Sequence, residues 1–223
     1  MSSKPLYIFG AGGHAREVLQ IVKDINASAP SPQWHLMGFL LDDGYHLPST
    51  HLNGLPVLQG PVRWGQPAAV VIAIGQSAAR KEVVRRLQGL GYSEFPTMVH
   101  PLAWMADTVV LGSGNVIFSG VLLNTDVTLG DHVHVNLGCS ISHDGRIGSY
   151  STLGPGTRIC GHCVTAEGTD IGAGCTLIPK ASIGEWSIIG AGAVVTGDIA
   201  ANATAVGVPA TVIKTRPQGW HAG

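Results

Sequence analysis

The sequence is poor in charge and in aromatic side chains. Of its 223 residues, 12% are charged and 6% are aromatic, and the formal net charge is −1. The sequence shows no basic cluster that would bind a nucleic acid or an anionic membrane, so neither is expected as a partner. The hydrophobic content of 45% is enough for a sizeable core, in one large domain or two small ones.

Long apolar runs and cysteines are scarce as well. The first residues, MSSKPLYIFGAGG, contain one lysine and a short apolar run that stops at glycine. This run is too short for a signal peptide or a membrane span, so we expect a cytoplasmic protein. The chain is too large to need disulfide bonds, and we expect free thiols at Cys139, Cys160, Cys163 and Cys175.

Glycine, by contrast, is abundant, and it accompanies a six-residue repeat in the second half of the chain. Of fifteen positions spaced by six, fourteen hold Leu, Ile or Val and one holds threonine. Glycine often follows the repeat position, and a small or β-branched residue often stands two positions before it. The repeat positions are Leu111, Ile117, Leu123, Leu129, Val135, Ile141, Ile147, Leu153, Ile159, Thr165, Ile171, Leu177, Ile183, Ile189 and Val195.

A period of six fits short strands joined by tight turns, three strands to a coil, with one aliphatic side chain per strand pointing inward. Each coil then takes 18 residues, and a residue lies over the one 18 positions later at a strand spacing of roughly 4.8 Å. We therefore predict a parallel β-helix, an all-β domain, over residues 100–214, with a C-terminal tail over 215–223. The open coil ends require caps or neighbouring subunits.

Residues 1–99 lack this period and alternate strand and helix patterns instead. The segments PLYIFGAGG, HLMGFLL and AAVVIAIG predict strands, and HAREVLQIVKDI and SAARKEVVRRLQGLG predict amphipathic helices. This order favours a small α/β domain with a parallel sheet.

The first turn of that domain, Gly10-Ala11-Gly12-Gly13-His14-Ala15, follows a strand and opens a helix. Glycines let the backbone approach a diphosphate, and a helix N-terminus supplies N–H donors. An NAD site is disfavoured because the acidic pair Asp42-Asp43 comes about thirty residues later rather than about twenty. Another kind of nucleotide-diphosphate site and a purely structural turn both remain open.

Asp42 and Asp43 end the second predicted strand, and Gly75 ends the next parallel one. In a wound sheet these carboxyl ends meet the glycine turn in one crevice, where ligands bind. The carboxylates are candidates to accept hydrogen bonds from a ribose, an amino group or a base. The alternative is that they are ordinary solvated turn formers.

The segment Cys160-Gly161-His162-Cys163 brings three potential zinc ligands close together in sequence. In the six-residue register, however, Cys139, Cys163 and Cys175 stand two before an aliphatic position, where small interior residues stand elsewhere. Cys160 occupies a different slot, so the four thiols do not converge as a tetrahedral set would. No metal site is predicted.

His143 lies two residues after the inward Ile141, where the β-helix turns a corner, so we predict an exposed imidazole. Asp144 would fix the ring tautomer, as a general base near neutral pH needs. Gly161 stands one coil later, where its N–H would face a developing oxyanion, and Thr125 stands one coil earlier. We predict a catalytic His143, against the alternative of a solvated histidine on a corner.

The hexapeptide register, the GAGGH turn, the DD pair, IAIG and SHD together resemble one family of acyltransferases. These enzymes join a small Rossmann-like sugar-nucleotide domain to a left-handed β-helix, and the pattern is most similar to bacillosamine and perosamine N-acetyltransferases and sialic acid O-acetyltransferases. The likeness runs from about residue 5 to residue 214. It implies a Rossmann-like domain over residues 1–99, acetyl-CoA as co-substrate, no metal, and a homotrimer with active sites between neighbouring β-helices.

The resemblance also implies roles for single residues. His143 would deprotonate a sugar amine, Asp144 would orient it, and Gly161 would donate to the thioester carbonyl. The acceptor would contact Gly10, Gly12, Gly13, His14, Asp42, Asp43, Gly75 and Asn136. Coenzyme A would lie near Gly161, Ala173, Ala191, the GVPA loop with Gly207 and Pro209, and Lys214.

The sequence departs from the family in three respects. Some relatives carry glutamate where this chain has Asp144, and some carry a second histidine where it has Thr152. The segments APSPQWHLMG and DDGYHLPSTHLNG lengthen the first domain.

The expected function is N-acetylation of the 4-amino group of a UDP- or GDP-linked sugar for surface glycan synthesis. O-acetylation of a sialic-acid-like sugar and a non-catalytic nucleotide-sugar-binding trimer are the alternatives.

Overall fold

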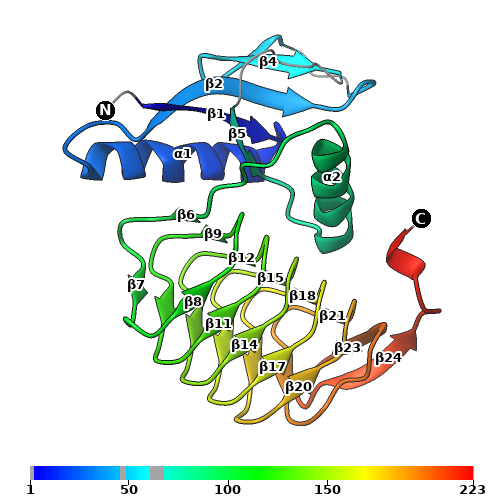
Figure 1. Cartoon of the computed structure of the whole chain (residues 1–223). Helices are drawn as coiled ribbons and strands as arrows, with labels where there is room; N and C mark the ends of the chain where they lie inside the picture. Colours follow the sequence, from blue (N-terminus) through cyan, green and yellow to red (C-terminus); the bar gives the residue numbers. More distant parts are fainter. Residues whose placement is uncertain (1–2, 46–48, 61–67, 223) are drawn as a thin grey trace.

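A computed structural model describes residues 3–45, 49–60 and 68–222 and shows an α/β domain lying along one side of a β-helix (Figure 1). Residues 46–48, within the lengthened DDGYHLPSTHLNG segment, lie outside the described residues. An α/β domain followed by a β-helix is the architecture that the sequence predicted.

The α/β domain is built on a parallel sheet of β1 (Lys4–Phe9), β2 (Trp34–Leu41), β4 (Leu55–Gln59) and β5 (Ala69–Ile72), with β3 (His51–Leu52) antiparallel at its edge. The strand order is β3-β4-β2-β1-β5. Side chains alternate between the two faces of β1. Leu6 and Ile8 pack in one apolar cluster with α1 (Gly13–Ser28), whereas Tyr7 and Phe9 pack in another with α2 (Ser77–Gly89).

The second half of the chain forms three sheets of two-residue strands. Sheet 1 contains β6 (Met98–Val99), β9 (Val116–Ile117), β12 (His134–Val135), β15 (Thr152–Leu153), β18 (Asp170–Ile171) and β21 (Ile188–Ile189), extended by β23 (Ala203–Val206) and β24 (Thr211–Thr215). Sheet 2 contains β7 (Trp104–Met105), β10 (Leu122–Leu123), β13 (Ser140–Ile141), β16 (Arg158–Ile159), β19 (Thr176–Leu177) and β22 (Val194–Val195). Sheet 3 contains β8 (Val110–Leu111), β11 (Thr128–Leu129), β14 (Arg146–Ile147), β17 (Val164–Thr165) and β20 (Ser182–Ile183).

From β6 to β22, strands one coil apart pair at the predicted offset of 18 residues, whereas β21 pairs with β23 at an offset of 16, Ile188 with Thr204. Leu123 pairs with Ile141, which pairs with Ile159, and the other two sheets follow the same rule. The repeat positions from Ile117 to Val195 are 3% exposed or less, so they form the core that the period predicted. Thr165 is among them, and its hydroxyl has no hydrogen-bond partner within the described parts of the chain.

The cysteines agree with the interior assignment. Cys139, Cys163 and Cys175 are fully buried, and each thiol donates to a main-chain carbonyl 15 residues further along the chain. Burial raises the pKa of all three thiols. All four cysteines are free.

The ends of the β-helix differ a little from the expected bounds. The first strand, β6, begins at Met98, two residues before the predicted start. At the other end β24 is followed by a short helix, η1 (Trp220–Ala222), whose His221 ring stacks on Trp186 with 3.7 Å between ring centroids. The tail thus returns to the β-helix near α2 (Figure 1).

Polar contacts join the α/β domain to sheet 1. His14 is hydrogen-bonded to His134 at 3.0 Å, and the Ser77 hydroxyl donates to Asp170 at 2.5 Å. Arg80 of α2 is fully buried at this junction. Its guanidinium donates to the Thr152 hydroxyl and to the carbonyls of Ile74, Gly75, His132, Tyr150 and Ser151.

Candidate active site

His143 and Asp144 lie on the edge between sheets 2 and 3, where β13 turns into β14. The two side chains are about half exposed, at 53% and 46%. His143 Nδ1 lies 2.8 Å from Asp144 Oδ2, and the hydrogen bond from His143 lowers the pKa of the Asp144 carboxyl. The carboxylate therefore fixes the Nδ1–H tautomer and leaves Nε2 as the acceptor of the ring.

Gly161 lies directly against this imidazole. A Cβ atom on Gly161 would be 2.6 Å from both Cε1 and Nε2 of His143, so only glycine leaves room for the ring. The Gly161 N–H has no hydrogen-bond partner in the described structure. The predicted stacking of residues 143 and 161 is confirmed, and an unpaired donor lies beside Nε2.

His162 is a third member of this edge; the sequence interpretation considered it only as a zinc ligand beside the cysteines and missed its place next to Asp144. It stands 18 residues after Asp144, and both residues have a left-handed backbone with φ of 59°. His162 Nδ1 lies 3.6 Å from Asp144 Oδ2, and its ring meets the His143 ring edge-on with 5.0 Å between centroids. The stacking rule that linked His143 to Gly161 also links Asp144 to His162, so the signal was present in the sequence.

The glycine turn lies at the carboxyl end of β1, next to the ends of β2 and β5. Gly10 is required by the fold, because its φ is 116° and a Cβ would lie 2.9 Å from the Ala73 carbonyl oxygen. Gly12 and Gly13 are exposed at the start of α1, and a Cβ on either would meet no backbone atom within 4 Å. The free N–H groups of this helix start are therefore accessible to a ligand.

The other residues predicted to contact the acceptor differ in whether protein groups already bind them. Asp42 is ion-paired with Arg86 of α2, whereas Asp43 is exposed beside Gly60. Gly75 follows β5, and its carbonyl accepts hydrogen bonds from Arg80 and Thr152 at the junction with sheet 1. His14 points instead into the junction with sheet 1, where burial lowers its pKa.

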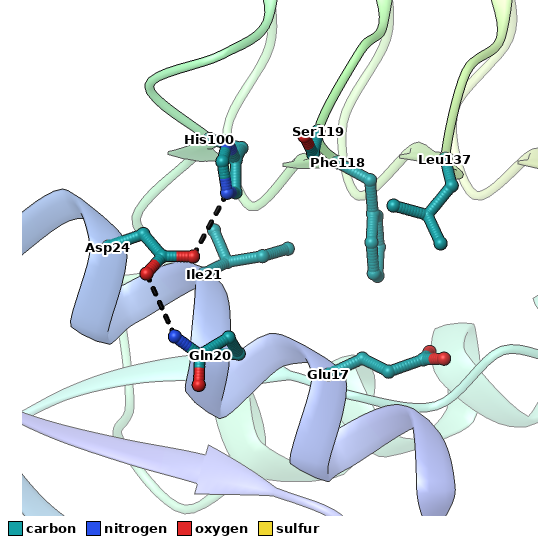
Figure 2. Close-up of a pocket in the computed structure, with 8 residues that line it drawn as sticks. All are labelled: Glu17, Gln20, Ile21, Asp24, His100, Phe118, Ser119 and Leu137. Atoms are coloured by element: carbon teal, nitrogen blue, oxygen red, sulfur yellow. Dashed lines mark hydrogen bonds and ion pairs between the residues drawn. The ribbon is translucent and has the colours of Figure 1, made fainter.

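A cavity of about 210 Å³ opens between α1 and the edge joining sheets 1 and 2 (Figure 2). Ile21, Phe118 and Leu137 supply its apolar wall, and Asp24, held by Gln20 and His100, closes one end (Figure 2). Asn136 precedes Leu137 on this edge, and its Oδ1 accepts a hydrogen bond from the Leu137 N–H. Asn136 is therefore on a different edge from His143.

The residues assigned to coenzyme A do not come together within one chain. Ala173 and Ala191 follow β18 and β21, on the edge between sheets 1 and 2, in line with Leu137. Gly161 is on the edge between sheets 2 and 3. Gly207 and Pro209 lie in the turn between β23 and β24, and Lys214 is exposed on β24.

The glycine turn and the His143 imidazole also lie on opposite sides of one chain. The α/β domain rests on sheet 1, whereas the edge with His143 is formed by sheets 2 and 3 (Figure 1). A ligand held at Gly12 and Gly13 is therefore remote from His143 of the same chain.

Comparison with known proteins identifies the family. The PglD N-terminal domain family model matches residues 5–87. GDP-perosamine N-acetyltransferase of Escherichia coli O157:H7 is 30% identical over 168 residues, which cover 74% of each chain. The chain belongs to this family of sugar N-acetyltransferases. A second member, UDP-N-acetylbacillosamine N-acetyltransferase of Bacillus subtilis strain 168, is 32% identical over 130 residues, or 52% of each chain.

Solved structures of the sugar N-acetyltransferase family share the whole architecture. PerB from Caulobacter crescentus, solved with CoA and GDP-perosamine, has a TM-score of 0.84 and 28% identity, covering 96% of this chain and 99% of its own. These neighbours are left-handed β-helix enzymes, which confirms the expected fold class. Among the described residues, no helix has the length and apolar character needed to span a membrane.

Proposed function

We propose that this chain transfers the acetyl group of acetyl-CoA to the 4-amino group of a nucleotide-linked amino sugar. The observation that carries the proposal is the exposed His143–Asp144 pair, with the unpaired N–H of Gly161 beside its Nε2. The relative solved with CoA and GDP-perosamine supports the choice of substrates. Such a reaction belongs in the cytoplasm and would serve surface glycan synthesis.

His143 is the general base in this proposal. Asp144 holds the proton on Nδ1, so Nε2 accepts the proton that the sugar amine loses as its nitrogen bonds to the acetyl carbon. The carbon–sulfur bond then breaks, and the proton passes from Nε2 to the departing thiolate. The carboxylate stabilises the imidazolium between these steps.

Gly161 has two roles in the proposal. Its missing side chain leaves room for the His143 ring, and its N–H has no hydrogen-bond partner among the described residues. An N–H donor that no protein group occupies is suited to the negative charge that develops on the thioester oxygen. The base and the donor already lie on neighbouring coils of one chain.

The acceptor and the base come from different chains in this proposal. The diphosphate binds at the start of α1, and the sugar extends along α1 into the cavity beside Asn136. Because His143 of the same chain is on the far side, a neighbouring chain must supply it. This arrangement favours the homotrimer, in which coenzyme A lies between two β-helices and contacts Ala173 and Ala191 of one and Gly161 of the next.

The test replaces His143 by alanine. Loss of the base should lower kcat by about 10²–10⁴-fold, while the oligomeric state and the affinity for the acceptor stay unchanged. Thiol release from acetyl-CoA with UDP-, GDP- and dTDP-linked 4-amino sugars measures kcat, and size-exclusion chromatography with light scattering measures assembly. His51→Ala, at an exposed histidine of the α/β domain, is the matched control.

Three results would contradict the proposal. Undiminished turnover in His143→Ala would show that His143 is not the base. Absence of turnover in the wild type with every amino sugar would favour a binding trimer. Turnover with CMP-sialic or free sialic acid alone would instead identify an O-acetyltransferase.

A further inference from the structure

We propose that His143, Asp144 and His162 bind a divalent transition-metal ion such as Zn²⁺, and that the bound ion blocks the base. Each residue offers one ligand atom, and the three atoms lie within 4.8 Å of one another. The group combines two imidazoles with one carboxylate, a donor set typical of zinc sites that keep an open position. Cys163 is buried in the core, and neither it nor Cys160 belongs to this group of ligand atoms.

The separations fit a zinc ion without a change of fold. Zn²⁺ binds nitrogen and oxygen at roughly 2.0–2.2 Å in a tetrahedron, which sets neighbouring ligand atoms roughly 3.3 Å apart. Asp144 Oδ2 lies 2.8 Å from His143 Nδ1 and 3.6 Å from His162 Nδ1, so small side-chain rotations suffice. All three side chains are about half exposed, which leaves the fourth position to water or to an incoming ligand.

The backbone holds the three ligands in place. Asp144 and His162 occupy the same corner position of consecutive coils, and the His162 N–H donates to the His143 carbonyl at 3.0 Å. The N–H of Lys180, one coil further, donates to the Gly161 carbonyl at 3.0 Å. A site formed on paired coils needs little ordering when the ion binds.

The consequence for the base rests on the proposed function. An ion on Nδ1 takes the place of the proton there, and the neutral ring must then carry its proton on Nε2. Nε2 becomes a donor and can no longer accept a proton from the amine. The ion therefore inhibits the transfer, although it binds opposite the reacting nitrogen.

The binding test uses Zn²⁺ alone and needs no activity. Isothermal titration of the chelator-treated full chain should show one Zn²⁺ site per chain, at least tenfold weaker in His162→Asn. Asparagine tolerates the left-handed backbone at this corner, so the variant should keep the fold, which circular dichroism checks. His51→Ala should bind Zn²⁺ like the wild type; equal affinity in the wild type and His162→Asn overturns the site.

The inhibition test follows acetyl transfer at rising Zn²⁺. The concentration for half inhibition should rise at least tenfold in His162→Asn relative to the wild type and to His51→Ala. If Zn²⁺ binds through His162 but does not inhibit acetyl transfer, the proposal that the ion blocks the base is wrong. If His143→Ala retains turnover, the proposed function fails, and the titration still decides the metal site.

Discussion

Four histidines of the β-helix differ sharply in burial. His132 and His134 are 3% and 1% exposed, and burial lowers the pKa of His132 to about 4 and that of His134 well below its usual range. His143 and His162 are both 53% exposed, so water can solvate their charged forms. The imidazoles suited to proton transfer or metal binding thus lie on the outer edge, and the buried ones are structural and neutral.

The buried His132 makes the free energy of unfolding depend on pH on the acidic side. A folded-state pKa of about 4 for His132, below the unfolded value of 6.5, means that the unfolded chain takes up this proton first. Stability is therefore fully present above about pH 6.5 and falls as the pH drops toward 4. Between pH 7 and 5 this group alone should cost about 2 kcal/mol of the free energy of unfolding.

The variant His132→Phe isolates this effect. Phenylalanine keeps the ring that stacks on Tyr150 and meets Phe95, and it leaves the carbonyl that accepts from Arg80. Urea unfolding at pH 7 and pH 5 should show a smaller loss in the variant than in the wild type, and His51→Ala should lose as much as the wild type. Equal losses in His132→Phe and the wild type would show that another group titrates.

At the scale of single strands, one stacking rule accounts for both the fold and the chemistry. The 18-residue offset aligns the aliphatic core and also sets His143 against Gly161 and Asp144 near His162. A side chain added on one coil therefore contacts the side chain stacked on the neighbouring coil.

Gly161→Ala tests this coupling between levels. The added Cβ would lie 2.6 Å from the His143 ring and must displace it, while the backbone N–H remains. We expect kcat to fall at least tenfold, since a base displaced by about 1 Å loses its alignment. Gly197→Ala, where a Cβ meets nothing within 4 Å, should keep full activity, and thermal melting of both variants checks the fold. An active Gly161→Ala would mean that the ring position is not critical.

The period also explains what the sequence could and could not predict. Spacing of six residues fixed the β-helix, its interior cysteines and the exposed His143, because all of these follow from one local register. The junction between the domains depends on contacts without such a period. Arg80 and Thr152, 72 residues apart, meet there, and His14 meets His134 across 120 residues, so no local pattern marks either pair.

At the scale of the whole molecule, the position of the α/β domain decides how a site can be assembled. Sheet 1 carries that domain, and the His143 edge is formed by the other two sheets. Within the described residues, the exposed large apolar side chains of sheet 2, Trp104 at 54% and Leu122 at 49%, lie next to each other on paired strands. An apolar surface on the sheet that borders both edges is expected to be covered by another copy of the chain.

Mixed trimers test whether one site uses two chains. Gly12→Asp places a carboxylate at the N-cap of α1, where no backbone is crowded, so α1 should be stabilised while an incoming diphosphate is repelled. Gly12→Asn, a neutral cap, is its control and should keep acceptor affinity.

His143→Ala and Gly12→Asp should each be nearly inactive alone. When the two are unfolded together, mixed equally and refolded, about one site in four should pair an intact crevice with an intact His143 of the neighbouring chain, so about a quarter of the wild-type kcat per chain should return. Mixing the folded variants without unfolding is the control for chain exchange, and in the proposed trimer it should restore nothing. If the co-refolded mixture also stays inactive, although scattering shows trimers and Gly12→Asn is active, the crevice and the base must serve the same chain.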